Sequence, residues 1–582
     1  MEIVSCRTTT ITKEVSLVLK FSEYRYERPD REAAADAFKE KIAAMRAAAS
    51  LEELLEAISA VNKLRNEIET MFQLVYIRHS INTEDAFYKA EQDYSDETSP
   101  ILQEYVTDYY RALTESPFRS GIEEKYGTQL LRTAELALKT FKPEIIEDLQ
   151  LENKLRTEYS QLIASARIPF DGEERTLSQL TPYTQSTDRA TRKSASEAAF
   201  GFLAGNEAEL DRIYDELVQV RTRIARQLGY ENYVQLGYDR LGRTDYDAAM
   251  VANFRRQVRE HIVPVASRLY ERQQARIGVD KLHYYDEGFR FKSGNPTPKG
   301  DPDWILEQGR RMYREMSPEL DEFFTFMSER ELLDLLSKKG KEGGGYCTYI
   351  FDYESPFIFA NFNGTSGDID VLTHEAGHAF QVYMSRGFDV PEYLWPTMEA
   401  AEIHSMSMEF LAWPWMELFF QEDTDKYRFD HLASALSFIP YGVSVDEFQH
   451  FVYEHPEATP AERKAKWREI ERVYTPHRSF DGNAYLEGGG RWQRQSHIYQ
   501  TPFYYIDYTL AQLCAFQFWK RSREDFDAAW QDYLALCRLG GSKSFTALAA
   551  SAGLLSPFED GSVTSVIGEI RSWLDSVDDS SF

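Results

Sequence analysis

Two histidines four residues apart, with a glutamate beside the first, are the strongest chemical signal in the sequence. His374 and His378 lie in VLTHEAGHAFQVYMSRG, where apolar residues recur at helical spacing and Gly387 follows as an expected helix end. On a helix, this spacing puts both imidazole rings on one face, so each can offer a nitrogen to the same tetrahedral metal ion. Glu375 lies beside them and could act on a water molecule bound by that ion. The motif therefore predicts a catalytic zinc site with Glu375 as its base.

The third metal ligand has to come from another segment, because a catalytic zinc ion usually has three protein ligands. The metzincin class would need Gly at position 381 and His at position 384, and it is excluded by Gln381 and Met384. The following segment, PTMEAAEIHSMSMEFLAWPWMELF, offers four side chains that can bind metals: Glu399, Glu402, His404 and Glu409. The three glutamates fall on roughly one helical face, and His404 points away from them. Since Met, Ala and Ile accompany them, we expect a partly buried acidic cluster.

The two segments together resemble the oligoendopeptidase F and thimet oligopeptidase family of zinc metallopeptidases. The resemblance rests on HEAGH followed by AAEIHSMSMEF, and it extends to FDGEERTLSQLTPYTQSTDRATRKSA, LGRTDYDAAMVANFRRQV and AGLLSPFEDG. It is closer to the bacterial oligoendopeptidase F branch and weakest over the first 150 residues. In that family a glutamate on the next helix is the third zinc ligand and another follows seven residues later, which matches Glu402 and Glu409. The resemblance implies one Zn²⁺ per chain, held by His374, His378 and Glu402, in an endopeptidase that cleaves oligopeptides.

An aromatic cluster follows a glycine run in GGGRWQRQSHIYQTPFYYIDYTLAQL: it contains His497, Tyr499, Tyr504, Tyr505 and Tyr508. A phenol or an imidazole N–H that faces a carbonyl oxygen stabilises the charge that develops there during peptide hydrolysis. Any one of these tyrosines could equally belong to an aromatic face of the core. In the family a similar histidine and tyrosines lie across the cleft from zinc. His497, Tyr505 and Tyr508 match them if one residue is deleted before Tyr505, and the roles of Tyr499 and Tyr504 stay open.

The elements that must position these groups are mostly helical. We expect a short extended segment at the N-terminus, long helices from about 30 to 141, a β-hairpin near 165–180 with its turn at Asp171-Gly172, and helices again from about 188 to 277. Ser50 and Glu53 have the spacing of a capping box. Residues 278–303 are rich in Gly, Pro and Asp and indicate a surface connection. Another helix pair follows, and YCTYIFDYESPFIFANFNG predicts two strands before helices resume near 370.

The strand candidate PFIFANFNG lies just before the histidine motif. In zinc peptidases, the strand at this position is an edge strand that pairs with the substrate backbone. A buried core strand fits the sequence of this segment equally well. The run from Gly343 to Gly345 lacks the Lys-Ser/Thr of a phosphate-binding loop, so we interpret it as a loop at the cleft. The remaining histidines, among them His431, show no metal-ligand spacing, and we expect them to be ordinary surface or core residues.

The family resemblance extends this mostly α fold to a large two-lobed zincin-type metallopeptidase, with a small β-sheet beside the HExxH helix and a deep substrate channel. We place an N-terminal helical lobe at 1–190, including the hairpin, and a catalytic helical lobe carrying the zinc site at 191–582.

Composition narrows the partners and the compartment. The 582 residues include 66 Lys and Arg against 95 Asp and Glu, a formal charge of −29, so nucleic acid and anionic membranes are poor partners. An apolar fraction of 43% indicates a folded chain. The four cysteines, Cys6, Cys347, Cys514 and Cys537, lack paired short spacing, and we find neither a signal peptide nor a membrane span. We therefore expect a cytoplasmic protein. Its oligopeptide partners are what the family resemblance implies, and its oligomeric state stays undetermined.

Two other functions fit the same motif. A zinc carboxypeptidase or peptidyl-dipeptidase would need a cation that fixes the substrate's C-terminal carboxylate, and Arg491 or Arg494 could provide it. A non-catalytic peptide-binding protein on a zincin scaffold is a third possibility, although such a protein has no chemical need of Glu375.

Overall fold

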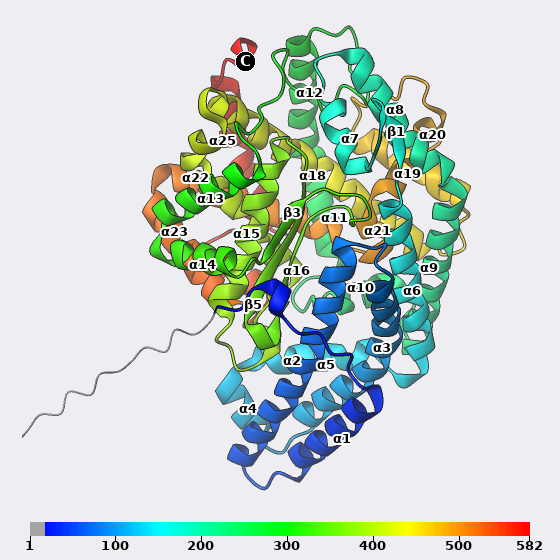
Figure 1. Ribbon diagram of the computed structural model, residues 1–582, viewed down its shortest axis with the longest axis vertical. Helices are drawn as coiled ribbons and strands as arrows, with labels where there is room; N and C mark the ends of the chain where they lie inside the picture. The colour runs from blue at the N-terminus through cyan, green and yellow to red at the C-terminus, as the bar shows by residue number, and fades with distance from the viewer. Residues whose placement is uncertain (1–17) are drawn as a thin grey trace, which may run out of the picture.

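The structure is a computed structural model that describes residues 18–582, and most of this chain is helical (Figure 1). The mostly helical fold expected from the sequence is confirmed, whereas the division into two lobes and the deep channel remain predictions. The expected extended segment at the N-terminus and Cys6 lie outside the described residues. Among the described cysteines, Cys347, Cys514 and Cys537 are free thiols. No helix between residues 18 and 582 combines the length and apolar character needed to cross a membrane.

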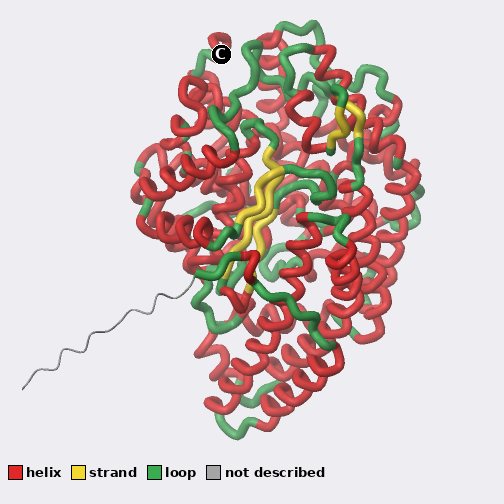
Figure 2. The backbone as a smooth tube through the Cα atoms, in the orientation of Figure 1, coloured by secondary structure: helices red, strands yellow, loops and turns green. Residues whose placement is uncertain are grey.

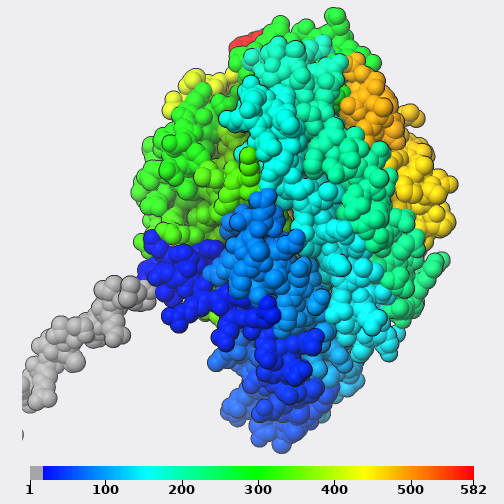
Figure 3. All heavy atoms as spheres, turned by 45° about the vertical axis from the view of Figure 1, so that its right-hand side comes forward, coloured from blue at the N-terminus to red at the C-terminus, as the bar shows by residue number. Residues whose placement is uncertain are grey.

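The N-terminal helices form the lower end of the molecule in Figures 1 and 3. They are α1 (Arg31–Ala47), α2 (Leu51–Ile81), α3 (Ala86–Thr114), α4 (Arg119–Tyr126) and α5 (Thr128–Thr140). Their apolar faces pack into a core around Ile58, Leu113 and Leu130, to which Val390 and Tyr393 also contribute. Ser50 caps α2 by accepting a hydrogen bond from the Glu53 N–H at 3.2 Å. Glu53 accepts in return from the N–H of Ala49, so the predicted capping box is shifted by one residue.

The predicted β-hairpin is confirmed. Strands β1 (Ile168–Phe170) and β2 (Glu173–Arg175) pair antiparallel, and Asp171 and Gly172 connect them with φ angles of 54° and 78°. Two successive positive φ angles are typical of the type I′ turn, which Asp-Gly favours because glycine has no Cβ to clash. Helices α6 and α7 flank the hairpin at Ile146–Ala164 and Leu177–Thr184.

Helices continue to residue 277, as the sequence predicts. They are α8 (Arg189–Gly205), α9 (Glu207–Leu228), α10 (Tyr233–Arg240), α11 (Ala248–Gln257) and α12 (Val263–Ile277). The predicted lobe boundary at 190–191 falls within the first turn of α8 and stays a prediction. The loop from 278 to 301 is the expected surface connection, and it leads to the expected helix pair, α13 (Pro302–Met316) and α14 (Pro318–Glu329).

A three-stranded sheet lies among the helices near the middle of the molecule (Figure 2). Its strands are β3 (Leu333–Leu336), β4 (Tyr346–Ile350) and β5 (Ser355–Phe362), in the order β3-β5-β4. Strand β5 is parallel to β3 and antiparallel to β4, with Tyr346 opposite Phe359. The segment PFIFANFNG is therefore the central strand, so of the two alternatives that the sequence left open the structure has the buried core strand. Strands β3 and β4 are the two edges of this sheet, and β3 escaped prediction because a four-residue Leu-rich strand looks like the end of a helix.

The second half of the chain supplies the helices around the histidine motif. They are α15 (Gly367–Ser385), α16 (Met398–Leu411), α17 (Glu417–Phe420), α18 (Thr424–Glu454), α19 (Pro460–Tyr474), α20 (Ala484–Glu487), α21 (Ser496–Gln500), α22 (Tyr505–Glu524), α23 (Phe526–Leu539), α24 (Phe545–Ser551) and α25 (Ser562–Ser576). Helix α16 packs on both α15 and α22. All of its residues are buried except Met398, the first, and Glu409. Helices α15 and α22, which carry most of the predicted site residues, therefore both pack against α16.

Candidate metal centre

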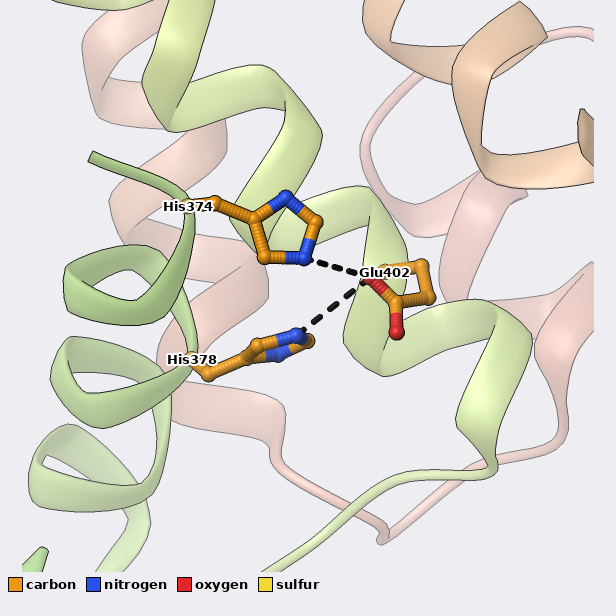
Figure 4. A group of neighbouring side chains, drawn as sticks. All are labelled: His374, His378 and Glu402. Atoms are coloured by element: carbon orange, nitrogen blue, oxygen red, sulfur yellow. Dashed lines mark ion pairs between the residues drawn. The ribbon is translucent and has the colours of Figure 1, made fainter. Parts of the chain in front are cut away.

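His374, His378 and Glu402 point one ligand atom each toward a common position (Figure 4). Oε2 of Glu402 lies 3.1 Å from Nε2 of His374 and 3.3 Å from Nε2 of His378. In a tetrahedron with metal–ligand bonds of about 2.0–2.2 Å, neighbouring ligand atoms are about 3.3–3.6 Å apart. The three side chains therefore fit a zinc ion, with the fourth position left for a water or a substrate.

Gly377 explains how two helices come close enough to build this set. A Cβ on Gly377 would lie 2.7 Å from both the carbonyl oxygen of His404 and the Cα of Ser405. The bare glycine therefore lets α16 approach α15 until their backbones nearly touch. Glu402, one turn before Ser405 on α16, reaches the histidines because of this approach.

A second carboxylate fixes the orientation of the first histidine. Glu409 accepts a hydrogen bond from Nδ1 of His374 at 2.7 Å and another from Nε2 of His431 at 2.8 Å. The indole of Trp413 donates to Nδ1 of His431 at 3.0 Å, and because an indole can only donate, the proton of the neutral His431 ring lies on Nε2. With its Nδ1 proton bound by Glu409, His374 presents the lone pair of Nε2 to the metal position.

Two hydroxyls hold the carboxylate of Glu402. Ser405 donates to Oε2 at 2.8 Å, and Tyr504 donates to Oε1. The side chain is 1% exposed, and its pKa lies well below the ordinary value although burial opposes this, because His378 and His374 stabilise the negative charge. Glu402 is thus held ionised, with one oxygen bonded to Tyr504 and the other facing the histidines.

Glu375 lies next to the ligand set, under the glycine run. A Cβ on Gly345 would be 3.1 Å from its Oε1, so this glycine leaves room for the carboxylate. Oε2 of Glu375 has no hydrogen-bond partner among residues 18–582. Burial raises the pKa of Glu375 above its ordinary value, as a carboxylate that accepts protons near neutral pH requires.

His497 faces the site as a neutral hydrogen-bond donor. Burial lowers its pKa to about 4, so the ring is uncharged at neutral pH. Tyr441 donates to Oε1 of Gln495 at 3.0 Å, which leaves the amide NH₂ of Gln495 to donate to Nδ1 of His497 at 2.7 Å. The ring proton is consequently on Nε2, 3.0 Å from the hydroxyl of Tyr508. His497 and Tyr508 together place an N–H and an O–H on one side of the site.

Of the other candidate residues, one lines the pocket and two are buried in the protein core. Tyr505 packs its ring against His497, with centroids 5.0 Å apart, and lines the pocket next to the metal position. Tyr499 is fully buried and donates to the carbonyl of Leu210, so it belongs to the core. His404 is also fully buried, and neither of its ring nitrogens has a partner in the described chain, as expected for a ring that points away from the ligands.

Glu399 lies one turn before Glu402 on α16 and is fully buried. Burial raises its pKa to about 7, against the attraction of Arg243. Its carboxyl group is not part of the ligand set. The predicted buried acidic cluster on α16 is therefore present, but only Glu402 and Glu409 of its three members contact the histidines.

A pocket of about 720 Å³ opens beside these residues. Its wall includes His497, Tyr505 and Tyr508, Gly344 and Gly345 of the glycine run, and residues of α15, α16 and α18. Four of its lining residues are acidic, namely Asp368, Asp370, Glu409 and Asp430, against one arginine, Arg290. The space next to the metal position can therefore admit part of a peptide and favours positive charge.

Sequence reasoning missed several groups that complete the site. The expectation that His431 is an ordinary residue is wrong, because it hydrogen-bonds Glu409 beside a predicted metal ligand. Tyr504, whose role was open, contacts Glu402, and Gln495 sets the tautomer of His497. The contacts of His431 and Tyr504 join α16 to α18 and to the residue just before α22, and no sequence spacing signals a contact between such distant segments.

Comparisons with known proteins cover most of the chain. The model of peptidase family M3 matches residues 182–293 and 319–565, and the model of the peptidase M3 N-terminal domain matches residues 21–141. A solved structure of PZ peptidase A with inhibitor 2 is 64% identical, covers 96% of this chain and 100% of that chain, and superposes with a TM-score of 0.96. A putative oligoendopeptidase F from Bacillus anthracis str. Ames is 59% identical over 97% of this chain and 99% of that chain, with a TM-score of 0.92.

A more distant relative is the oligoendopeptidase F homolog of Borreliella burgdorferi. It is 24% identical over 384 residues, which is 63% of this chain. The match spans 62% of the length of that relative.

Proposed function

The chain belongs to peptidase family M3, and we propose that it is a zinc-dependent endopeptidase that hydrolyses internal bonds of oligopeptides. The observation that carries this proposal is the set of His374, His378 and Glu402, whose ligand atoms are spaced for a tetrahedral metal, with Glu375 beside them. The related structures of PZ peptidase A and oligoendopeptidase F support the choice of oligopeptides as substrates.

His374, His378 and Glu402 would hold one Zn²⁺. When bound, zinc supplies Lewis acidity, which lowers the pKa of a coordinated water and polarises the scissile carbonyl group. Glu409 keeps the imidazole of His374 turned toward the metal position through its hydrogen bond to Nδ1. Tyr504 holds Oε1 of Glu402 and so leaves Oε2 for the ligand role.

Glu375 would be the general base. Its carboxylate would accept a proton from the attacking water and later give it to the leaving amine. The raised pKa that burial causes suits this exchange, because a stronger base accepts the proton more readily. Gly345 leaves room for this carboxylate, because a Cβ there would lie 3.1 Å from Oε1 of Glu375.

His497 and Tyr508 would stabilise the negative charge that develops on the carbonyl oxygen. Gln495 fixes the tautomer of His497, whose Nε2–H lies 3.0 Å from the hydroxyl oxygen of Tyr508, so the phenol keeps its own proton to donate to the substrate oxygen. Tyr505 would support them by packing against the ring of His497. Donors that are oriented before the reaction stabilise the transition state more than the ground state.

The test combines metal analysis with cleavage of a peptide blocked at both ends. We expect Glu375→Gln to retain zinc and to lose about 10²- to 10⁴-fold in kcat, because only the proton acceptor is removed. Glu524→Gln, at the exposed end of α22, is the matched control and should behave as the wild type. Zinc-loaded protein that leaves every blocked peptide intact would refute endopeptidase activity. If it released residues only from peptides with a free C-terminus, a carboxypeptidase would be favoured instead.

A further inference from the structure

Phe503 has a strained backbone conformation directly before Tyr504. Its φ angle is 67°, in the left-handed region that a bulky side chain rarely adopts. Among the residues other than glycine that have a positive φ angle between positions 18 and 582, Phe503 is the buried one. Such a conformation costs free energy and persists only where the surrounding structure imposes it. The residue that follows is Tyr504, whose hydroxyl holds Oε1 of Glu402.

Three other segments of the chain hold Phe503 in this conformation. Its N–H donates to Oε1 of Gln449 on α18 at 2.9 Å, and its carbonyl oxygen accepts from Nη2 of Arg243 at 2.7 Å. Its ring lies against Gly237 of α10, where a Cβ would be 2.6 Å from the ring. The surroundings thus fix both backbone polar groups of Phe503 and its side chain.

Arg243 binds the chain on both sides of Tyr504. The same Nη2 that donates to the carbonyl of Phe503 also donates to Oδ1 of Asp507 at 2.6 Å, in the first turn of α22. The N–H of Asp507 in turn donates to the carbonyl of Tyr504 at 2.9 Å. The side chains of Arg243 and Asp507 are both 0% exposed, so water does not weaken this ion pair. Cζ of Arg243 also lies 4.3 Å from the ring centroid of Tyr238, which fixes the guanidinium further.

We propose that Arg243 is a positioning residue for the metal centre, because it holds Phe503 in the left-handed conformation and so places the hydroxyl of Tyr504 on Glu402. The proposal rests on the proposed zinc site. If φ of Phe503 relaxed to the ordinary negative values, the chain would leave this residue in another direction and carry the phenol of Tyr504 away. Glu402 would then be held by Ser405 alone, and its carboxylate could turn Oε2 away from the histidines.

A double-mutant cycle in zinc affinity tests whether Arg243 acts through Tyr504. Competition with a fluorescent chelator measures the zinc affinity of the wild type, Tyr504→Phe, Arg243→Met and the double variant. We expect each single change to weaken zinc binding by about 10-fold, because each removes the hydroxyl that holds a ligand. The double variant should also lose only about 10-fold, since the hydroxyl that Arg243 positions is already absent, whereas independent losses would multiply to about 100-fold.

Arg192→Met is the matched control. The side chain of Arg192 is 2% exposed, and like Arg243 it donates to one buried carboxylate, that of Asp286, and to a backbone carbonyl, that of Ser186. We expect Arg192→Met to lower the melting temperature, because it leaves a buried carboxylate unpaired, and to keep the zinc affinity of the wild type. A loss of zinc affinity that merely follows stability would appear in this control as well.

Two further variants complete the test. Arg243→Lys keeps a charged donor next to Asp507 and should recover part of the zinc affinity that Arg243→Met loses. Gln449→Met frees the N–H of Phe503 without leaving a buried charge, and it takes the place of Arg243→Met in the cycle if that variant does not fold.

An unchanged zinc affinity in Arg243→Met would overturn the proposal, as would a double variant whose loss is the product of the two single losses. The same two results carry the same meaning in the cycle with Gln449→Met. Failure of the wild type to bind zinc would instead contradict the proposed function, so the two failures can be told apart.

Discussion

The close approach of α15 and α16 at Gly377 provides the sharpest test of how this site is built. In Gly377→Ala the new methyl group would lie 2.7 Å from the His404 oxygen and the Ser405 Cα. Ordinary contacts are about 3.5 Å, so α16 must move outward by about 0.8 Å. The distances of 3.1 and 3.3 Å between the histidine nitrogens and Glu402 would then approach about 4 Å, too long for one tetrahedral ion.

The expected magnitude follows from the cost of overpacking. An added methyl group in a packed interior costs about 1–3 kcal/mol. In the metal-free protein, α16 can move outward and relieve this strain. Zinc binding then has to bring α16 back and recreate the strain, so the zinc affinity falls by roughly 5- to 160-fold. Competition with a fluorescent chelator measures the zinc affinity, and thermal unfolding of metal-free protein measures the strain that remains.

Gly387→Ala is the matched control for this change. A Cβ on Gly387 meets nothing within 4 Å, and the residue follows the same helix. We expect its zinc affinity and its melting temperature to equal those of the wild type or to exceed them slightly. If Gly377→Ala also binds zinc as tightly as the wild type, the contact between the helices does not set the ligand geometry and our reasoning is wrong.

Three further predictions concern groups around the metal position. Glu409→Ala should weaken zinc binding by about 10- to 100-fold in chelator competition, because His374 loses the acceptor that orients it; unchanged affinity would contradict that role. Gln495→Leu should lower kcat about fivefold through loss of the bond that fixes the tautomer of His497, whereas His497→Phe should lower it by about 10²- to 10³-fold; equal losses would show that Gln495 does more than orient the ring. Burial raises the pKa of Asp368 from 3.8 to about 6, so the stability that its proton binding provides is present below pH ~4 and is lost as the pH rises through ~6. Urea unfolding should therefore show Asp368→Asn gaining up to about 3 kcal/mol relative to the wild type between pH 4 and pH 7, and a difference independent of pH would refute this.

Local patterns in the sequence predicted much of the fold. The helical spacing of apolar residues, the Asp171-Gly172 turn and the alternation of aromatic residues in 346–362 each report on neighbours along the chain, and the corresponding elements are present. The order of strands is a different matter. Whether β5 is central or at an edge depends on β3 and β4, which pair with it from other parts of the sequence. The run PFIFANFNG is equally compatible with both positions.

The sequence by itself determined the ligand types and their possible faces: His374 and His378 are one helical turn apart, and Glu402 and Glu409 share a face, because a helix repeats every 3.6 residues. Only the tertiary structure decided which partners each group has. It placed His431 on Glu409, Tyr504 on Glu402 and Arg491 beyond Tyr441. Such contacts arise when distant helices pack side by side, and the free energy that selects them is shared among many buried side chains, so no single spacing in the sequence encodes them.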